Sequence, residues 1–228
     1  MKKEWIYSCI LSAGLCILGI CIYCGFKSVA DKDRIVTVKG LSTRDVRADY
    51  VVWAIDFDVR GNDLVATYAE RNREMEAIKQ FLKAKGFEDT DFRESTTRVS
   101  DNWAKYYVNR QQYQYSIGSK LVVATNKVDL VEQQKNTLTE LLNQGIMVNS
   151  NDWSTDFQFN GLNELKPIMI EEATKNARAV AQKFADDAEC DLGTIRHASQ
   201  GQFSVESDEY TPIIKHVRVV TTISYSLD

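Results

Sequence analysis

The stretch that decides the fold of this chain is WAIDFDVRG at residues 53–61, because it returns as WSTDFQFNG at residues 153–161. Trp, Asp, Phe and Gly hold the same places in both copies, shifted by 100 positions. Mostly apolar residues alternate with polar ones and a glycine closes each run, which is typical of a half-buried strand that ends in a turn. A long helical pattern follows each copy. We therefore predict two related β-α-β-β units.

The rest of the chain fits an α+β fold around these two copies. The first unit is expected at about residues 50–125 and the second at about residues 151–228, after a separate strand at 34–40. The other predicted strands lie at 50–60, 92–107, 113–125, 194–205 and 216–227, and the helices at 62–85, 126–143 and 162–188. We expect antiparallel pairing, with the long helices packed on one face of the sheet.

Each long helix carries an apolar stripe whose members recur at spacings of three and four residues. In the first helix the stripe consists of Leu64, Val65, Tyr68, Met75, Ile78 and Leu82. In the last helix it consists of Leu162, Leu165, Met169, Ala173, Ala177, Val180, Phe184 and Ala188. The many alanines indicate that the last helix approaches its neighbour closely.

Composition and charge place the chain among ordinary globular proteins. It has 228 residues, of which 44% are apolar and 26% charged, and its net charge is −4. Residues 1–30 hold three lysines and one glutamate, so residues 31–228 carry a net charge of −6. An acidic domain lacks the basic surface patch through which proteins bind nucleic acids and anionic lipid surfaces. The sequence therefore predicts no nucleic-acid partner.

The N-terminal segment predicts a membrane connection. Residues 5–26 hold no charge, and as a helix they would span about 33 Å, close to a hydrocarbon core of about 30 Å. One alternative is an uncleaved anchor in residues 1–30. The other is a cleaved signal peptide, for which Ser28-Val29-Ala30 is a tolerable site. The length of the apolar run favours the anchor. In both cases residues 31–228 form a domain on the far side of the membrane.

The cysteines offer one candidate for chemistry. Cys9, Cys16, Cys21 and Cys24 lie in the apolar segment, where they act as small apolar residues. Cys190 stands alone in residues 31–228, so it has no intrachain disulfide partner there. No Lys, Arg or His occurs in the five residues before it to lower its pKa. We expect an inert thiol, with a redox role as the alternative.

Other catalytic or metal-binding patterns are missing from the sequence. His197 and His216 fall outside the usual metal-ligand spacings, and no nucleophile-elbow or phosphate-loop motif occurs. Asp56 and Asp156 recur as a carboxylate pair, but they occupy the outward phase of a strand, where charge is expected. Trp53 and Trp153 are expected to be matched core residues. The sequence thus predicts no enzyme, no cofactor and no metal.

The best candidate for an interaction surface is an aromatic hairpin. Five aromatic residues fall within 13 positions around a polar connection: Trp103, Tyr106, Tyr107, Tyr113 and Tyr115. Tyr and Trp are favoured at interfaces because they bury a large area at a small entropic cost. The alternative is a long twisted hairpin with solvated tyrosines.

The order and spacing of several short segments resemble the SIMPL domain family, a bacterial envelope domain of unknown function. The matching segments are RIVTVKG at 34–40, the strand ending at Gly61, Ala69…Asn72 leading to Lys85-Gly86-Phe87, Val128-Asp129-Leu130, Asn143-Gln144-Gly145, Glu172-Ala173…Ala177-Arg178…Ala181, Asp191-Leu192-Gly193 and the closing VRVVTTISYSL. Together they cover nearly all of residues 31–228. The family pattern has a glycine before the last Leu-Gly turn, where this chain has Cys190-Asp191.

The resemblance implies a periplasmic or cell-surface protein that oligomerises and is loosely linked to oxidative or envelope stress. It brings no catalytic residues with it. We therefore expect a non-enzymatic, self-assembling protein of the bacterial inner membrane, tethered through residues 5–26, with its domain in the periplasm or outside. The alternative is a ligand-binding or thiol-based redox protein that acts through Cys190 or through a cleft between the two units.

Overall fold

The computed structural model describes residues 14–23, 34–104, 112–149 and 154–228. It has a mixed α+β fold with antiparallel sheets, as the sequence predicts. The chain separates into two compact units. Unit 1 comprises the chain up to Arg44, Glu164–Val205 and Val217–Asp228, and unit 2 comprises Asp45–Asn163 and Glu206–His216.

Unit 2 is built on a six-stranded sheet of order β3-β5-β2-β6, in which β4 also pairs with β5 and β7 with β2. The strands are β2 (Tyr50–Gly61), β3 (Phe92–Glu94), β4 (Arg98–Asp101), β5 (Tyr115–Thr125), β6 (Val148–Asn149) and β7 (Thr155–Gln158). Thr155–Gln158 of the second copy thus form β7, which lies antiparallel beside β2 in the same sheet.

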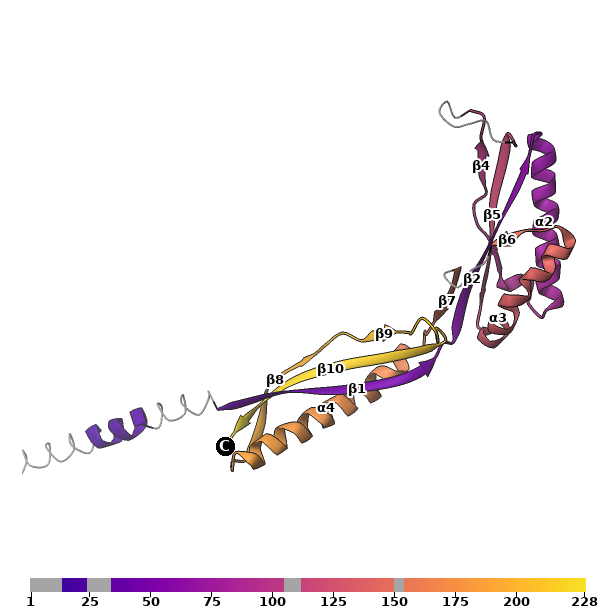
Figure 1. Cartoon of the computed structure of the whole chain (residues 1–228). Helices are drawn as coiled ribbons and strands as arrows, with labels where there is room; N and C mark the ends of the chain where they lie inside the picture. The colour runs from indigo at the N-terminus through magenta and orange to yellow at the C-terminus, as the bar shows by residue number, and fades with distance from the viewer. Residues whose placement is uncertain (1–13, 24–33, 105–111, 150–153) are drawn as a thin grey trace, which may run out of the picture. The chain divides into compact units, whose positions relative to one another are not determined.

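Helices cover one face of this sheet (Figure 1). They are α2 (Leu64–Ala84), α3 (Val128–Gln134) and the 3₁₀ helix η3 (Lys135–Gln144), with a short 3₁₀ turn η2 (Asp89–Asp91) before β3. Asp63 caps α2 by accepting a hydrogen bond from the Ala66 amide at 2.8 Å. Gly145, at φ 78°, ends η3 in the left-handed conformation that glycine adopts without strain.

The core of unit 2 confirms the alternation read from β2. Its odd-numbered residues from Val51 to Val59 are at most 6% exposed, and they pack against Met75, Ile78 and Leu82 of α2. The first turns of α2 differ from the prediction, because Leu64, Val65 and Tyr68 are exposed. Thr67 and Arg71 face inward instead. Arg71 can do so because Ser119 and Glu94 accept hydrogen bonds from its guanidinium.

Unit 1 contains most of a sheet of order β1-β10-β8, with β9 also paired to β10. The strands are β1 (Ile35–Arg47), β8 (Leu192–Gln200), β9 (Ser204–Glu206) and β10 (Ile214–Leu227), and α4 (Leu162–Asp187) runs along one face (Figure 1). The prediction that the first strand ends at Gly40 is wrong, since β1 continues to Arg47.

The reason is the packing of α4. A Cβ atom at Gly40 would lie 1.8 Å from the Ala173 carbonyl oxygen, so this glycine lets helix backbone touch strand backbone. The buried stripe of α4 is correspondingly small: Met169, Ala173, Ala177, Ala181 and Ala185. The predicted stripe is correct at Met169, Ala173 and Ala177, whereas Leu162 and Leu165 are half-buried and Ala188 is exposed. Val180 and Phe184 are exposed, at 42% and 56%.

In the N-terminal segment, residues 14–23 are helical. Among the described residues, no helix is both long enough and apolar enough to span a membrane. The other positions of the predicted span, 5–13 and 24–26, lie outside the described residues.

Candidate functional site

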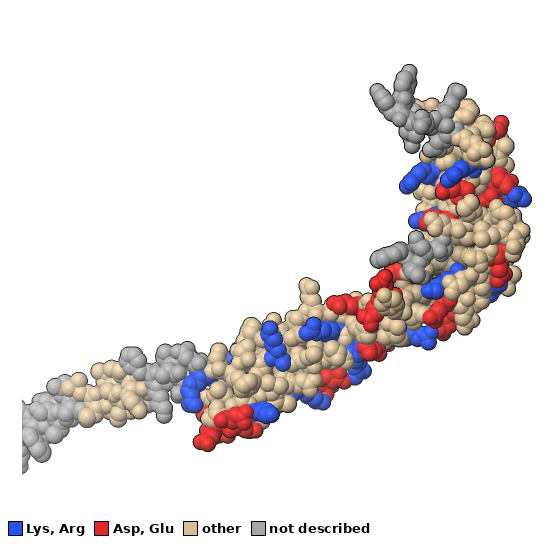
Figure 2. Space-filling model, in the orientation of Figure 1, with Lys and Arg blue, Asp and Glu red and all other residues tan. Residues whose placement is uncertain are grey.

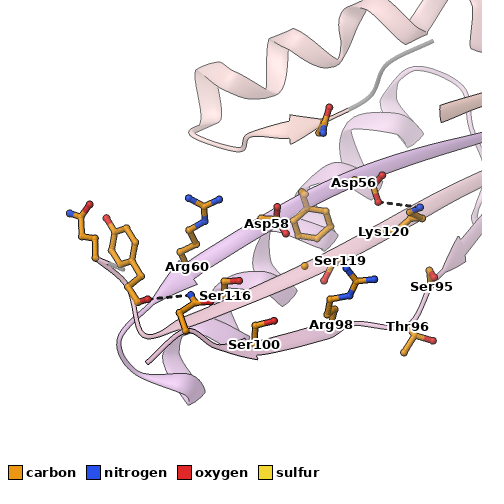
Figure 3. Close-up of a pocket in the computed structure, with 16 residues that line it drawn as sticks. Asp56, Asp58, Arg60, Ser95, Thr96, Arg98, Ser100, Ser116, Ser119 and Lys120 are labelled. Carbon is orange, nitrogen blue, oxygen red and sulfur yellow. Dashed lines mark hydrogen bonds and ion pairs between the residues drawn. The ribbon is translucent and has the colours of Figure 1, made fainter. Parts of the chain in front are cut away.

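A polar groove of about 970 Å³ lies on the face of the unit 2 sheet that the helices leave open. β2, β4 and β5 supply most of its lining (Figure 3). Its charged lining residues are Asp56, Asp58, Arg60, Arg98 and Lys120. The others are Phe57, Ser95, Thr96, Ser100, Asn102, Gln112, Tyr113, Ser116, Gly118, Ser119 and Asn149.

Strand alternation and register arrange these side chains in rows. The even-numbered residues of β2 point away from the core, and antiparallel pairing aligns them with even-numbered residues of β5 and β4. One row contains Arg60, Ser116 and Ser100. The next contains Asp58, Gly118 and Arg98, and a third pairs Asp56 with Lys120. The rows bring residues 60 and 98 to one surface although 38 positions separate them.

The charges in the groove are unevenly paired. Lys120 Nζ lies 3.4 Å from Asp56 Oδ1, so these two charges compensate each other. Within the described part of the chain, neither Arg60 nor Arg98 forms an ion pair. On the face of the molecule in Figure 2, Lys and Arg are interspersed with Asp and Glu. A ligand of this face would therefore be selected by local groups of charge, such as these two arginines, and not by the overall charge of the surface.

Gly118 determines the shape of the floor. A Cβ atom there would lie 2.8 Å from Asp58 Oδ1, so the glycine leaves room for this carboxylate over β5. Beneath the floor, Arg71 of α2 donates from Nε to Ser119 Oγ at 2.8 Å and from Nη2 to Glu94 Oε2 at 3.2 Å. A hydrogen bond from Lys79, and a second from Arg71, lower the pKa of Glu94. These hydrogen bonds join β3 and β5 to α2.

The predicted aromatic surface is only partly described by the structure. Trp103 and Tyr113 are about two-fifths exposed, and Tyr113 lines one end of the groove. Asn102 Nδ2 donates to the Tyr113 carbonyl oxygen at 3.3 Å and holds this end together. Tyr115 is half-buried, and its hydroxyl accepts from Gln114 Nε2 at 3.1 Å. Tyr106 and Tyr107 lie outside the described residues.

The repeated carboxylates do not form a site together. Asp56 lies in the groove, whereas Asp156 is paired in register with Val52 and accepts a hydrogen bond from Gln158 Nε2 at 2.6 Å. Trp53 is fully buried, as predicted, and Trp153 lies outside the described residues. The thiol of Cys190 is half-buried and contacts the Ala185 carbonyl oxygen at 3.6 Å. In the described ranges, no group of three metal-ligating side chains is present.

A second polar cluster, which the sequence did not reveal, surrounds His216 in unit 2. Its Nδ1 lies 2.6 Å from Asp45 Oδ1 and its Nε2 lies 3.3 Å from Asp208 Oδ2. The hydrogen bond with Asp45, followed by that with Asp208, raises the pKa of His216. Next to it, Lys215 Nζ donates to Ser207 Oγ at 3.1 Å, and burial lowers the pKa of this lysine. Both contacts hold the loop between β9 and β10.

Comparison with known proteins identifies the family. The model of the SIMPL family, described as a protein of unknown function (DUF541), matches residues 36–220, so the chain belongs to this family. No curated protein matches the chain. The family membership predicted from the sequence is thereby confirmed.

Proposed function

We propose that this SIMPL protein is a non-enzymatic binding protein of the bacterial envelope, tethered to the inner membrane through residues 5–26, with its domain in the periplasm or outside. The observation that carries the binding role is the open groove of unit 2, in which Arg60 and Arg98 form no ion pair within the described part of the chain. Unpaired guanidinium groups on a concave surface are ready to bind an anionic group. The uncharged N-terminal run supports the tether.

Hydrogen exchange of the full-length protein in detergent micelles tests the binding role. Addition of an envelope extract is expected to slow exchange at backbone amides of β4 and β5 in the parent. The double variant Arg60→Gln/Arg98→Gln should lose this protection. If the extract protects neither strand, the groove is not a binding site.

Self-assembly is a second proposed role, and unit 1 supplies the observation that favours it. β1 and β8 end the order β1-β10-β8, so each has an outer edge without a partner strand among the described residues. Ile35, Leu41 and Ile195 on these strands are 44–53% exposed. Unpaired edges with exposed apolar side chains favour pairing with another chain.

Light scattering of the full-length protein at several concentrations tests this role. A discrete multiple of the protomer mass is the expected result, and a monomer at every concentration would contradict it. The aromatic residues Trp103, Tyr106, Tyr107, Tyr113 and Tyr115 remain the next surface to mutate.

A role in envelope or oxidative stress stays a proposal. If that role depends on the Cys190 thiol, the Cys190→Ser variant should lose stress protection. An unchanged phenotype would exclude a thiol-based role.

A further inference from the structure

The lining of the groove narrows the class of ligand beyond the proposed binding role, on which this inference rests. We propose that the groove binds an acidic glycan, in which Arg60 and Arg98 bind ligand carboxylates and Asp58 accepts hydrogen bonds from ligand hydroxyls.

An extended peptide is a poor match for this groove. Peptides that add to a sheet gain affinity from main-chain hydrogen bonds at a free strand edge. The floor of the groove is a sheet face, on which β2 pairs with β5 and β5 with β4, so this face presents side chains and not free backbone groups to a ligand. Only side chains are left to recognise a ligand. Sugars fit such a surface because they bind through hydroxyl groups and ring faces.

A ligand that is purely apolar or purely anionic is also a poor match for the groove. An apolar ligand would find almost no apolar wall, because the Phe57 side chain is buried in the core and Tyr113 is the one large aromatic side chain exposed among the lining residues. A simple polyanion would meet Asp56 and Asp58 in the floor. The Asp56 carboxylate is compensated by Lys120, but Asp58 has no ion pair within the described residues. The ligand therefore needs hydrogen-bond donors as well as negative charge.

An acidic glycan supplies both groups at once. Its carboxylates can accept paired hydrogen bonds from the planar guanidinium groups of Arg60 and Arg98. Its hydroxyls can donate to Asp58, which lies over Gly118 in the same row as Arg98 and next to the row that contains Arg60. Ser95, Thr96, Ser100 and Ser116 offer short hydroxyl groups that both donate and accept. Tyr113, at the end of the groove, provides an aromatic face for a sugar ring.

The length of the site suits a chain rather than a single sugar. Asp56 and Arg60 are four residues apart on β2, which corresponds to about 13 Å along an extended strand. The volume of about 970 Å³ is at the upper end for a small-molecule site. Such a groove can hold several sugar units of an extended chain.

The test is calorimetric titration of the full-length protein in micelles with three probes. These are an oligogalacturonate, which carries a carboxylate on each ring, a neutral galactose oligomer of the same length, and a poly-glutamate peptide of the same charge. We expect binding of the oligogalacturonate at least tenfold tighter than binding of the other two. Arg60→Gln/Arg98→Gln should weaken it by about 100-fold, because two charge-assisted contacts are lost.

Two further variants make the result decisive. Arg73→Gln/Arg178→Gln removes the same charge from α2 and α4 outside the groove, and should leave the affinity within about twofold of the parent. Asp58→Ala removes the proposed hydroxyl acceptor, so it should weaken oligogalacturonate binding about tenfold. At a site that recognises charge alone, loss of this carboxylate would instead strengthen binding.

Three outcomes would overturn the inference. They are equal binding of poly-glutamate and oligogalacturonate, tighter binding by Asp58→Ala, and no heat with any probe at millimolar concentration. Protection of β4 and β5 by the envelope extract would still support the binding role in each of these cases. The two proposals therefore fail separately.

Discussion

Replacing Gly40 by alanine should open unit 1, because α4 lies against β1 at backbone distance. The added Cβ atom would lie 1.8 Å from the Ala173 carbonyl oxygen and 2.6 Å from the Ala177 amide nitrogen. Ordinary contacts of this kind begin at 3.4 Å. Both obstructing atoms belong to the helix backbone, so no side-chain rotation relieves the clash.

The cost follows from the size of this overlap. The helix has to move by about 1.5 Å to reach an ordinary contact, and overpacking of a well-filled core costs about 1–3 kcal/mol. Since backbone must move, we expect the upper end, a loss of about 3 kcal/mol in the free energy of unfolding. At 1.4 kcal/mol per factor of ten, protection from opening falls by about 100-fold.

Hydrogen exchange of the full-length protein in micelles measures this loss. Amides of α4 and of β10 within unit 1 should exchange about 100-fold faster in Gly40→Ala than in the parent. Gly14→Ala is the matched control, because nothing lies within 4 Å of a Cβ atom at that position. Exchange in α4 within threefold of the parent would refute the reasoning that close backbone packing at Gly40 holds the helix.

Three smaller perturbations test other contacts. Because the pKa of His216 is raised in the folded state, its contribution to stability is complete below the unfolded value of about 6.5 and is lost as pH rises through the folded pKa. Exchange of the loop amides at residues 207–210 should accelerate over that upper range in the parent, and a similar acceleration in His216→Gln would contradict the assignment. Asp63→Ala removes the cap of α2 and should lower the free energy of unfolding of unit 2 by about 1 kcal/mol in guanidinium titrations, whereas an unchanged midpoint would show that the cap contributes nothing. Gly145→Ala places a Cβ atom at φ 78° and should cost about 1 kcal/mol in the same titration, and a stabilised variant would show that the left-handed conformation is not retained.

Patterns that depend on neighbouring residues could be read from the sequence alone. The period-two alternation of β2 predicted which side chains enter the core, because successive residues of any strand point to opposite faces. The helices predicted at 62–85 and 126–143 likewise begin and end within two residues of α2 and of α3 with η3, since capping and left-handed turns are local requirements. Membership of the SIMPL family followed from the order of several such short segments.

The face of α4 shows where local patterns stop being sufficient. Hydrophobicity alone placed Val180 and Phe184 in the buried stripe, but both are exposed. The buried positions are Ala181 and Ala185, because the helix lies too close to the strand for larger side chains. That closeness comes from Gly40, more than 130 positions away, and Gly40 read by itself indicated a turn.

The groove and the His216 cluster likewise depend on the tertiary structure, because both bring together residues that are far apart in the sequence. Arg60 and Arg98 share a surface only because β4, β5 and β2 pair in one particular register. His216 meets Asp45 across 171 positions of sequence. The sequence by itself determined the alternation of β2, the approximate ends of α2 and η3, and the family. Which charged side chains converge depended on strand register, which is a property of the whole sheet and not of any one segment.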